Sequence, residues 1–105
     1  MALTKKFKDT IQARALRGPE FKAGLLKESV ECLLSGNMAT GKILLRDYIN
    51  ATIGFEELAD LTKKSSKSLM RMFGPEGNPR ANNLFNIIKT LQEKEGIHLE
   101  VHTIV

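Results

Sequence analysis

Apolar residues recur at spacings of three and four along most of the chain, which is typical of amphipathic helices that share one core. Glycine and proline residues separate the periodic stretches and indicate where helices stop and start. The pattern predicts six helices, over Leu3–Arg17, Pro19–Leu34, Met38–Thr52, Phe55–Thr62, Ser65 or Ser66 to Phe73, and Ala81–Glu95. The expected fold class is therefore all-α.

The same spacing predicts which side chains face the core. The expected inward residues are Phe21, Leu25, Leu26, Val30, Leu33 and Leu34, then Ile43 or Leu44, Leu45, Tyr48, Ile49 and Ile53, then Leu58, Ala59 and Leu61, then Leu69, Met72 and Phe73, and finally Leu84, Ile87, Ile88 and Leu91, with Phe85 at the edge.

The stretch from Phe55 to Phe73 predicts two short helices joined by a turn at Lys63-Lys64-Ser65. Ala59 is small enough to let two helix backbones approach, and Leu69 is expected to lie over it. This arrangement is a helix-turn-helix, whose second helix can enter the DNA major groove. The competing interpretation is an ordinary corner between two helices that binds no nucleic acid.

The last nine residues change period. Ile97, Leu99 and Val101 alternate with polar residues, which predicts a β-strand over 97–105. A lone strand leaves its backbone groups unpaired, so we expect it to pair with another chain, either a second copy or a different protein. His98, Glu100 and His102 share one face of this strand, but a solvated face is the default interpretation and no metal site is predicted.

Composition fits one small globular domain. The chain has 105 residues and a formal charge of +4, and we divide it into a helical extension (1–37), a helix-turn-helix core (38–96) and the strand (97–105). Residues 1–37 carry seven Lys/Arg against four acids, whereas the segment from Ala81 carries two against three. A basic balance permits an anionic partner. No secretory signal or membrane-spanning run is expected, and the single cysteine, Cys32, fits a cytoplasmic protein.

The segment Gly36–Lys42 matches the first seven positions of a phosphate-binding P-loop, but Ile43 stands where the magnesium-binding Ser or Thr is required. The segment also follows a helix rather than a strand, so we interpret it as a turn between helices. No acid pair, Cys-His or Ser-His-Asp arrangement is evident, and we expect no enzyme activity and no cofactor.

The run Leu69-Met70-Arg71-Met72-Phe73-Gly74-Pro75-Glu76-Gly77-Asn78-Pro79, followed by Leu84 and Ile87-Ile88, resembles the HigA-like addiction-module antidote proteins (antitoxins). These belong to the lambda-repressor-like (Xre) helix-turn-helix class. The resemblance covers about Phe21 to Val101 and is strongest over 55–91. It implies a lambda-repressor-like bundle and a homodimeric transcriptional autorepressor, encoded beside a RelE/HigB-like ribonuclease toxin that it neutralises.

This chain departs from that family in the turn. Lys63 stands where the family usually has Gly, and a left-handed Lys would cost on the order of 1 kcal/mol. Lys64 occupies a position that is usually apolar, and Met70 one where a polar or aromatic residue is common. The N-terminal helix is basic, which does not suit the binding of a basic toxin.

The recognition helix presents candidate DNA contacts in two groups. Base edges would be read by Ser66, Lys67, Met70 and Arg71. Phosphates would be met by Lys63, Lys64, Arg80, Asn82 and Asn83. Ser65 is expected to cap the helix. In the alternative function the helices form a protein–protein interaction module, a dimer or toxin-binding scaffold with weak or no DNA binding, and these side chains only keep the surface soluble.

Overall fold

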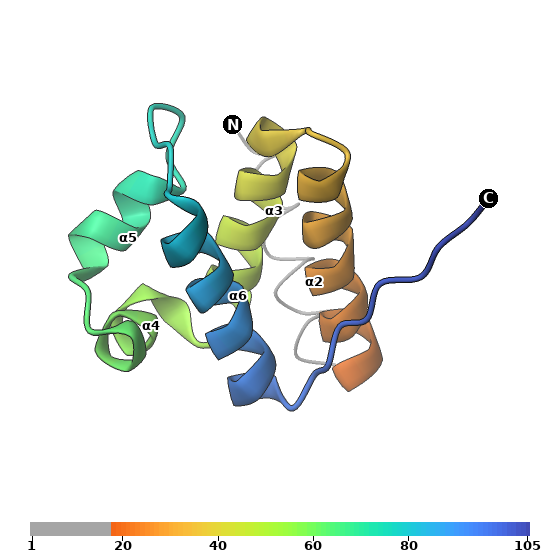
Figure 1. Ribbon diagram of the computed structural model, residues 1–105. Coiled ribbons are helices and arrows are strands. Elements are labelled where there is room, and N and C mark those ends of the chain that lie inside the picture. Colours follow the sequence, from red (N-terminus) through yellow and green to blue (C-terminus); the bar gives the residue numbers. More distant parts are fainter. Residues whose placement is uncertain (1–17) are drawn as a thin grey trace, which may run out of the picture.

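The computed structural model describes residues 18–105 of the chain. This part contains five α-helices and no strand: α2 (Pro19–Leu34), α3 (Met38–Ala51), α4 (Gly54–Thr62), α5 (Ser66–Met72) and α6 (Ala81–Glu95) (Figure 1). The all-α class is confirmed, and each described helix begins and ends within one or two residues of its predicted bounds. The helix predicted over Leu3–Arg17 lies outside the described residues.

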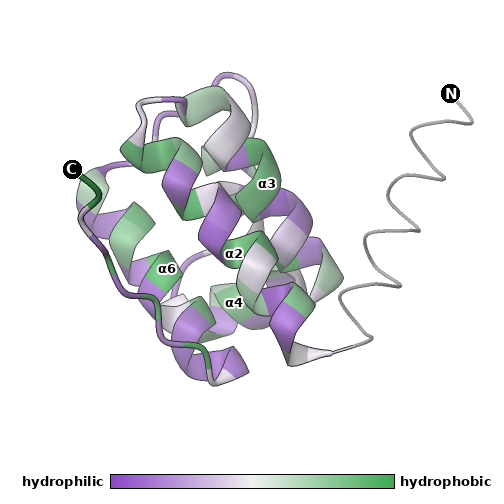
Figure 2. Ribbon diagram, turned by 90° about the vertical axis from the view of Figure 1, so that its right-hand side faces the viewer, coloured by the Kyte–Doolittle hydropathy of each residue, from purple (hydrophilic) through white to green (hydrophobic). Residues whose placement is uncertain are grey.

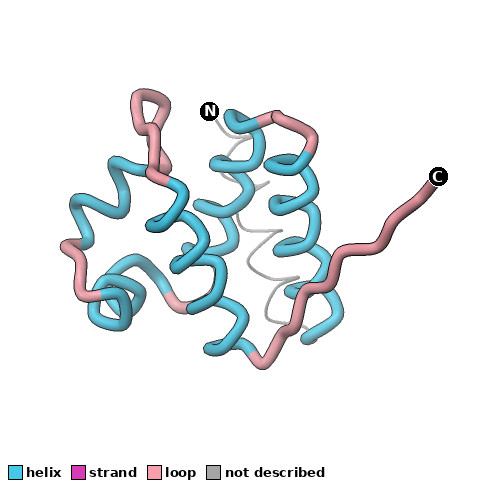
Figure 3. The backbone as a smooth tube through the Cα atoms, in the orientation of Figure 1, coloured by secondary structure: helices cyan, strands magenta, loops and turns pink. Residues whose placement is uncertain are grey.

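The helices form two pairs with α6 between them (Figure 1). Helices α2 and α3 pack side by side and share the most extensive helix–helix contact, and the short α4 and α5 form the other pair. Helix α4 also contacts α3 and α6, so it connects the two halves of the bundle. As a result, α5 lies at one edge of the molecule, while α2 and the C-terminal segment lie at the other (Figures 1 and 3).

One hydrophobic cluster receives side chains from all five helices. Its most completely buried members are Leu26, Leu45, Tyr48, Ile49, Leu58, Leu69, Ile87 and Leu91, together with Phe73 just after α5. The rings of Phe55 and Phe73 lie 6.2 Å apart at a tilt of 54°, a favourable aromatic arrangement that ties the start of α4 to the end of α5. Ala59 is buried as predicted.

Three of the residues that the spacing places toward the core are exposed. Leu34 is 67% exposed, Leu61 50% and Ile43 48%. The physical reason is that each of these helices meets its neighbours over a face narrower than its apolar stripe. Between the two alternatives on α3, the structure buries Leu44 partly and leaves Ile43 outside. Phe85 lies at the edge of the core as predicted and is mostly exposed.

The prediction of a C-terminal strand is wrong for this chain. Residues 97–105 are extended but form no ladder, because the described residues contain no second strand with which to pair (Figure 3). The amide of Ile97 instead donates to the carbonyl of Gln92, and the amide of Leu99 donates to Oε1 of the same residue at 2.9 Å. The alternation survives in part, since Ile97 and Leu99 are half-buried and His98 is exposed.

Beyond Leu99 the segment leaves the core. The apolar side chains of Val101, Ile104 and Val105 are almost wholly exposed, and Figure 2 shows this apolar end of the chain at the surface. His102 and Glu100 pair with each other at 3.7 Å. Residues 18–105 hold no cluster of three or more potential metal ligands. None of the helices in that range is long and apolar enough to cross a bilayer.

Candidate nucleic-acid interface

The connection from α4 to α5 is a tight turn over residues 63–65. Lys63 adopts the left-handed conformation (φ 57°, ψ 38°), and its amide donates to the carbonyl of Ala59. The amide of Lys64 donates to the same carbonyl at 3.1 Å. Ser65 then caps α5, because its hydroxyl oxygen accepts from the amide of Ser68 at 3.0 Å. The start of the short helix is therefore fixed by hydrogen bonds rather than by its own length.

Helix α5 divides into an inner and an outer face. Leu69 is fully buried and Phe73 nearly so, with Met72 partly buried beside them. Of the four predicted base-contacting residues, Lys67, Met70 and Arg71 are exposed, Met70 by 53%, and Ser66 is half-buried at the first position of the helix. The outer face of α5 thus offers two cations and one apolar side chain to solvent.

The predicted phosphate-contacting residues lie at two places in the chain. Lys63 is exposed and Lys64 half-buried in the turn before α5, while Arg80 is the residue preceding α6 and is exposed. Asn82 is exposed and Asn83 half-buried in the first turn of α6. Within residues 18–105, the side chains of these five residues make no hydrogen bond to another protein group.

In the described part of the chain, charged residues of α4 and α6 form ion pairs, whereas the basic residues on and around α5 do not. The ion pairs within residues 18–105 join Lys22 to Glu95, Lys94 to Glu57 and His102 to Glu100. The Lys94–Glu57 pair is short, at 2.7 Å, and the hydrogen bond that Lys94 donates to the Glu57 carboxylate raises the pKa of Lys94. The carboxylate of Glu57 on α4 is therefore paired with a lysine of α6. In contrast, the basic residues on α5 and its flanking turns belong to none of these pairs: Lys63, Lys64, Lys67, Arg71 and Arg80.

The loop after α5 is attached to α3 by a contact that sequence reasoning missed. Lys42 is only 9% exposed, and its Nζ donates to the carbonyls of Gly74 and Gly77 at 3.0 and 2.6 Å. A hollow of about 250 Å³ lies alongside, lined by Ala39, Lys42, Ile43, Arg46, Phe73, Gly74 and Pro75. The incomplete P-loop motif singled out Lys42, but its partners are backbone carbonyls more than thirty residues away.

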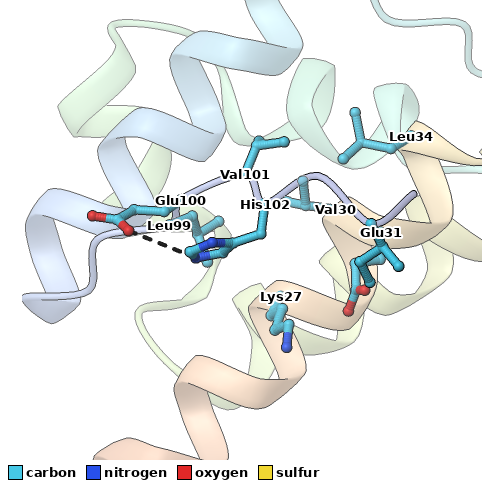
Figure 4. A pocket seen from close by; sticks show the side chains of 9 residues that line it. Lys27, Val30, Glu31, Leu34, Leu99, Glu100, Val101 and His102 are labelled. Atoms are coloured by element: carbon cyan, nitrogen blue, oxygen red, sulfur yellow. Dashed lines mark ion pairs between the residues drawn. The ribbon is translucent and has the colours of Figure 1, made fainter.

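A second hollow lies on the other side of the molecule, between α2 and the C-terminal segment (Figure 4). It measures about 230 Å³ and is mainly apolar. Its lining comprises Lys27, Val30, Glu31, Leu34, Leu99, Glu100, Val101, His102 and Ile104. It is therefore separate from the outer face of α5.

Comparison of the whole chain with protein-family models, curated proteins and solved structures finds no match.

Proposed function

We propose that this protein is a sequence-specific, double-stranded-DNA-binding transcriptional regulator of the lambda-repressor-like helix-turn-helix class. The observation that carries the proposal is the outer face of α5. Lys67, Met70 and Arg71 are exposed there at the edge of the molecule, while Leu69 fastens the other face to the core. A short helix held in this way can enter the major groove, which admits one helix.

The chemistry of this face suits base recognition. Arg71 and Lys67 carry donors for guanine O6 and N7, and Met70 offers an apolar contact for the thymine methyl group. Ser66, at the first helical position, is half-buried, and its hydroxyl supplies one further hydrogen-bonding group for a base edge. Lys63, Lys64, Arg80, Asn82 and Asn83 then contact phosphates on either side of α5, which sets the register without selecting sequence.

The biological role proposed here is that of a cytoplasmic antitoxin and autorepressor of a toxin–antitoxin pair. Its support is the resemblance of the run from Leu69 to Pro79 to HigA-like antitoxins. In this role the protein acts as a homodimer on two half-sites and binds a RelE/HigB-like toxin. Coexpression with the product of a neighbouring small basic reading frame tests the toxin arm, and failure of the two proteins to copurify would remove it.

DNA binding is tested by titrating the full chain against its own promoter duplex at several salt concentrations. Each phosphate neutralised contributes a slope of about −0.9 to log K against log[salt], so several contacts must give a steep fall in affinity. A scrambled duplex of equal length serves as the control for specificity. No binding to either duplex at low salt would overturn the proposal.

The alternative of a protein–protein interaction module is favoured by one observation. The apolar hollow between α2 and the C-terminal segment is bordered by Leu34, Val101 and Ile104, all of them mostly exposed. Such a surface would bind a partner mainly by apolar burial, which salt weakens little. Association that is insensitive to salt, combined with absence of DNA binding, is the outcome that would select this alternative.

A further inference from the structure

The ammonium group of Lys42 is committed to the loop that follows α5. Two of its three N–H donors bond to Gly74 and Gly77, and the side chain is nine-tenths buried. A buried ammonium without partners would be strongly unfavourable, so these carbonyls account for its position. The carbonyl oxygens gain in return a charged donor that water cannot easily replace.

This loop is packed directly against the last turn of α5. The amide of Gly74 donates to the carbonyl of Arg71, and the amide of Gly77 donates to Gly74, both at 3.1 Å. Gly77 lies so close to the carbonyl oxygens of Arg71 and Met72 that a Cβ at this position would overlap them. Any displacement of the loop is therefore transmitted to the backbone that carries Arg71.

Helix α5 needs such an attachment. It has seven residues, too few for a helix to be stable without tertiary contacts, and its main helical neighbour is α4. The N-terminal end is fixed by the Ser65 cap. The C-terminal end depends on the core contact of Phe73 and on the loop that Lys42 holds.

We propose that Lys42 is a positioning residue for the DNA-reading face: from α3, its ammonium group holds the loop at Gly74–Gly77 and thereby sets the orientation of Arg71. This inference rests on the proposed DNA binding. It assigns to Lys42 no contact with DNA, because the group is buried and bonded inside the protein. Replacing Lys42 must then lower affinity without lowering the number of phosphates neutralised.

The test compares the full-length protein with Lys42→Met, which keeps the aliphatic stem and removes the donors. Lys27→Met is the control for loss of charge, since Lys27 is an exposed residue of α2, on the side of the molecule away from α5 (Figures 1 and 4). Ile49→Val is the control for general destabilisation, because Ile49 is a fully buried core residue of the same helix as Lys42. Hydrogen exchange at the amides of Gly74 and Gly77 is measured without DNA, and affinity for the promoter duplex across a salt series is measured with it.

For Lys42→Met we expect exchange at these two amides to accelerate at least about tenfold relative to Ile49→Val, because losing even one of the two charged hydrogen bonds would have an effect of this size. Affinity for the promoter duplex should fall about tenfold, as expected when a base-reading arginine is displaced, with the salt slope unchanged. Lys27→Met should leave loop exchange at the wild-type rate.

Unchanged exchange at Gly74 and Gly77 would overturn the inference, as would faster exchange with wild-type DNA affinity. A salt slope shallower by about 0.9 would show instead that Lys42 contacts a phosphate. If the wild-type protein binds no duplex, the proposed function and the DNA part of this inference are both wrong, while the exchange measurement still decides whether Lys42 holds the loop.

Discussion

At the scale of single residues, Lys63 occupies the least favourable backbone position in the described part of the chain. It is the one non-glycine residue there with positive φ, and a Cβ in that conformation lies too close to the following carbonyl. The turn between α4 and α5 requires this geometry, because it lets both Lys63 and Lys64 donate to Ala59. This position suits glycine but carries a lysine, whose exposed side chain is one of the proposed phosphate contacts.

Lys63→Gly should therefore raise the free energy of unfolding by about 1 kcal/mol. The substitution removes the steric cost of the left-handed lysine, and the greater flexibility of glycine in the unfolded chain offsets part of that gain. The same substitution should weaken binding to all DNA sequences equally if the side chain meets a phosphate. Lys63→Ala is the matched control, since it removes the charge but keeps the Cβ. Denaturant unfolding and duplex titration separate the two effects, and equal stability of the Gly and Ala variants would contradict the argument.

Tyr48 presents a different problem, because its hydroxyl is fully buried and has no hydrogen-bond partner among residues 18–105. Burial raises the pKa of the hydroxyl far above its ordinary value, and the negative charge of Glu95 adds to the shift. The folded protein therefore holds this proton at a pH where the unfolded chain, with an ordinary tyrosine pKa near 10, releases it. Ionisation of Tyr48 therefore leaves the free energy of unfolding unchanged below pH 10 and lowers it as the pH rises above 10.

Tyr48→Phe should raise stability at neutral pH by up to about 1 kcal/mol, because an unsatisfied buried hydroxyl is removed. Above pH 10 the wild type should lose about 1.4 kcal/mol per pH unit relative to the variant. Denaturant titrations of the wild type and the variant at each pH from 7 to 11 measure this difference in the free energy of unfolding. The lysines titrate in both proteins alike, so their contribution cancels from the difference. A constant difference over that range would show that the hydroxyl ionises as readily in the folded protein as in the unfolded chain, and therefore that it reaches solvent.

At the scale of helices, amphipathic spacing together with glycine, proline and capping residues was sufficient to place α2 to α6. The information is local: Ser65 caps α5 and Gly96 ends α6 in the left-handed conformation. The strand at 97–105 was predicted wrongly because alternation describes an extended chain, whereas a strand also requires a partner. The side chain of Gln92 supplies the bond to Leu99 instead, and no local pattern indicates that.

In the candidate interface, too, the sequence predicts the local features but not the contacts between distant residues. The outward position of Lys67, Met70 and Arg71 follows from the three- and four-residue spacing of Leu69, Met72 and Phe73. The attachment of the following loop does not, because Lys42 bonds to Gly74 and Gly77, 32 and 35 residues further along the chain. Sequence spacing can assign a side chain to a face of its own helix, but it cannot identify a distant backbone group as its partner.

The outer face of α5 leads to a prediction about DNA recognition. Arg71→Ala should weaken binding to the promoter by roughly 1–3 kcal/mol and relax the preference at one base pair. Lys64→Ala, its counterpart in the turn, should weaken binding to every sequence alike and make the salt slope shallower by about 0.9. Titrations against the promoter and single-base variants measure both. Equal losses on promoter and scrambled duplex for Arg71→Ala would show that Arg71 contacts phosphate rather than base.

At the scale of the whole molecule, the core joins the pair α2 and α3 to the pair that carries the candidate interface. Leu26 of α2 and Leu69 of α5 belong to the same buried cluster, and Lys22 of α2 pairs with Glu95 of α6 at 3.8 Å. The sequence pattern predicts that residues 1–37 form a helical extension to a helix-turn-helix core over 38–96. If the shared cluster governs folding, α2 must instead unfold together with the other helices.

Leu26→Ala tests this cooperativity, because Leu26 is fully buried and belongs to α2, which lies at the opposite edge of the molecule from α5 (Figure 1). Truncation of a buried leucine should cost about 2–5 kcal/mol. In a cooperative molecule hydrogen exchange of the most protected amides in α2, α3 and α6 accelerates by the same factor, since each exchanges through global unfolding. Leu34→Ala, at a mostly exposed position of the same helix, is the control and should change these rates little. Loss of protection confined to α2, with α3 to α6 unchanged, would identify α2 as a separable extension, and DNA binding would then survive its removal.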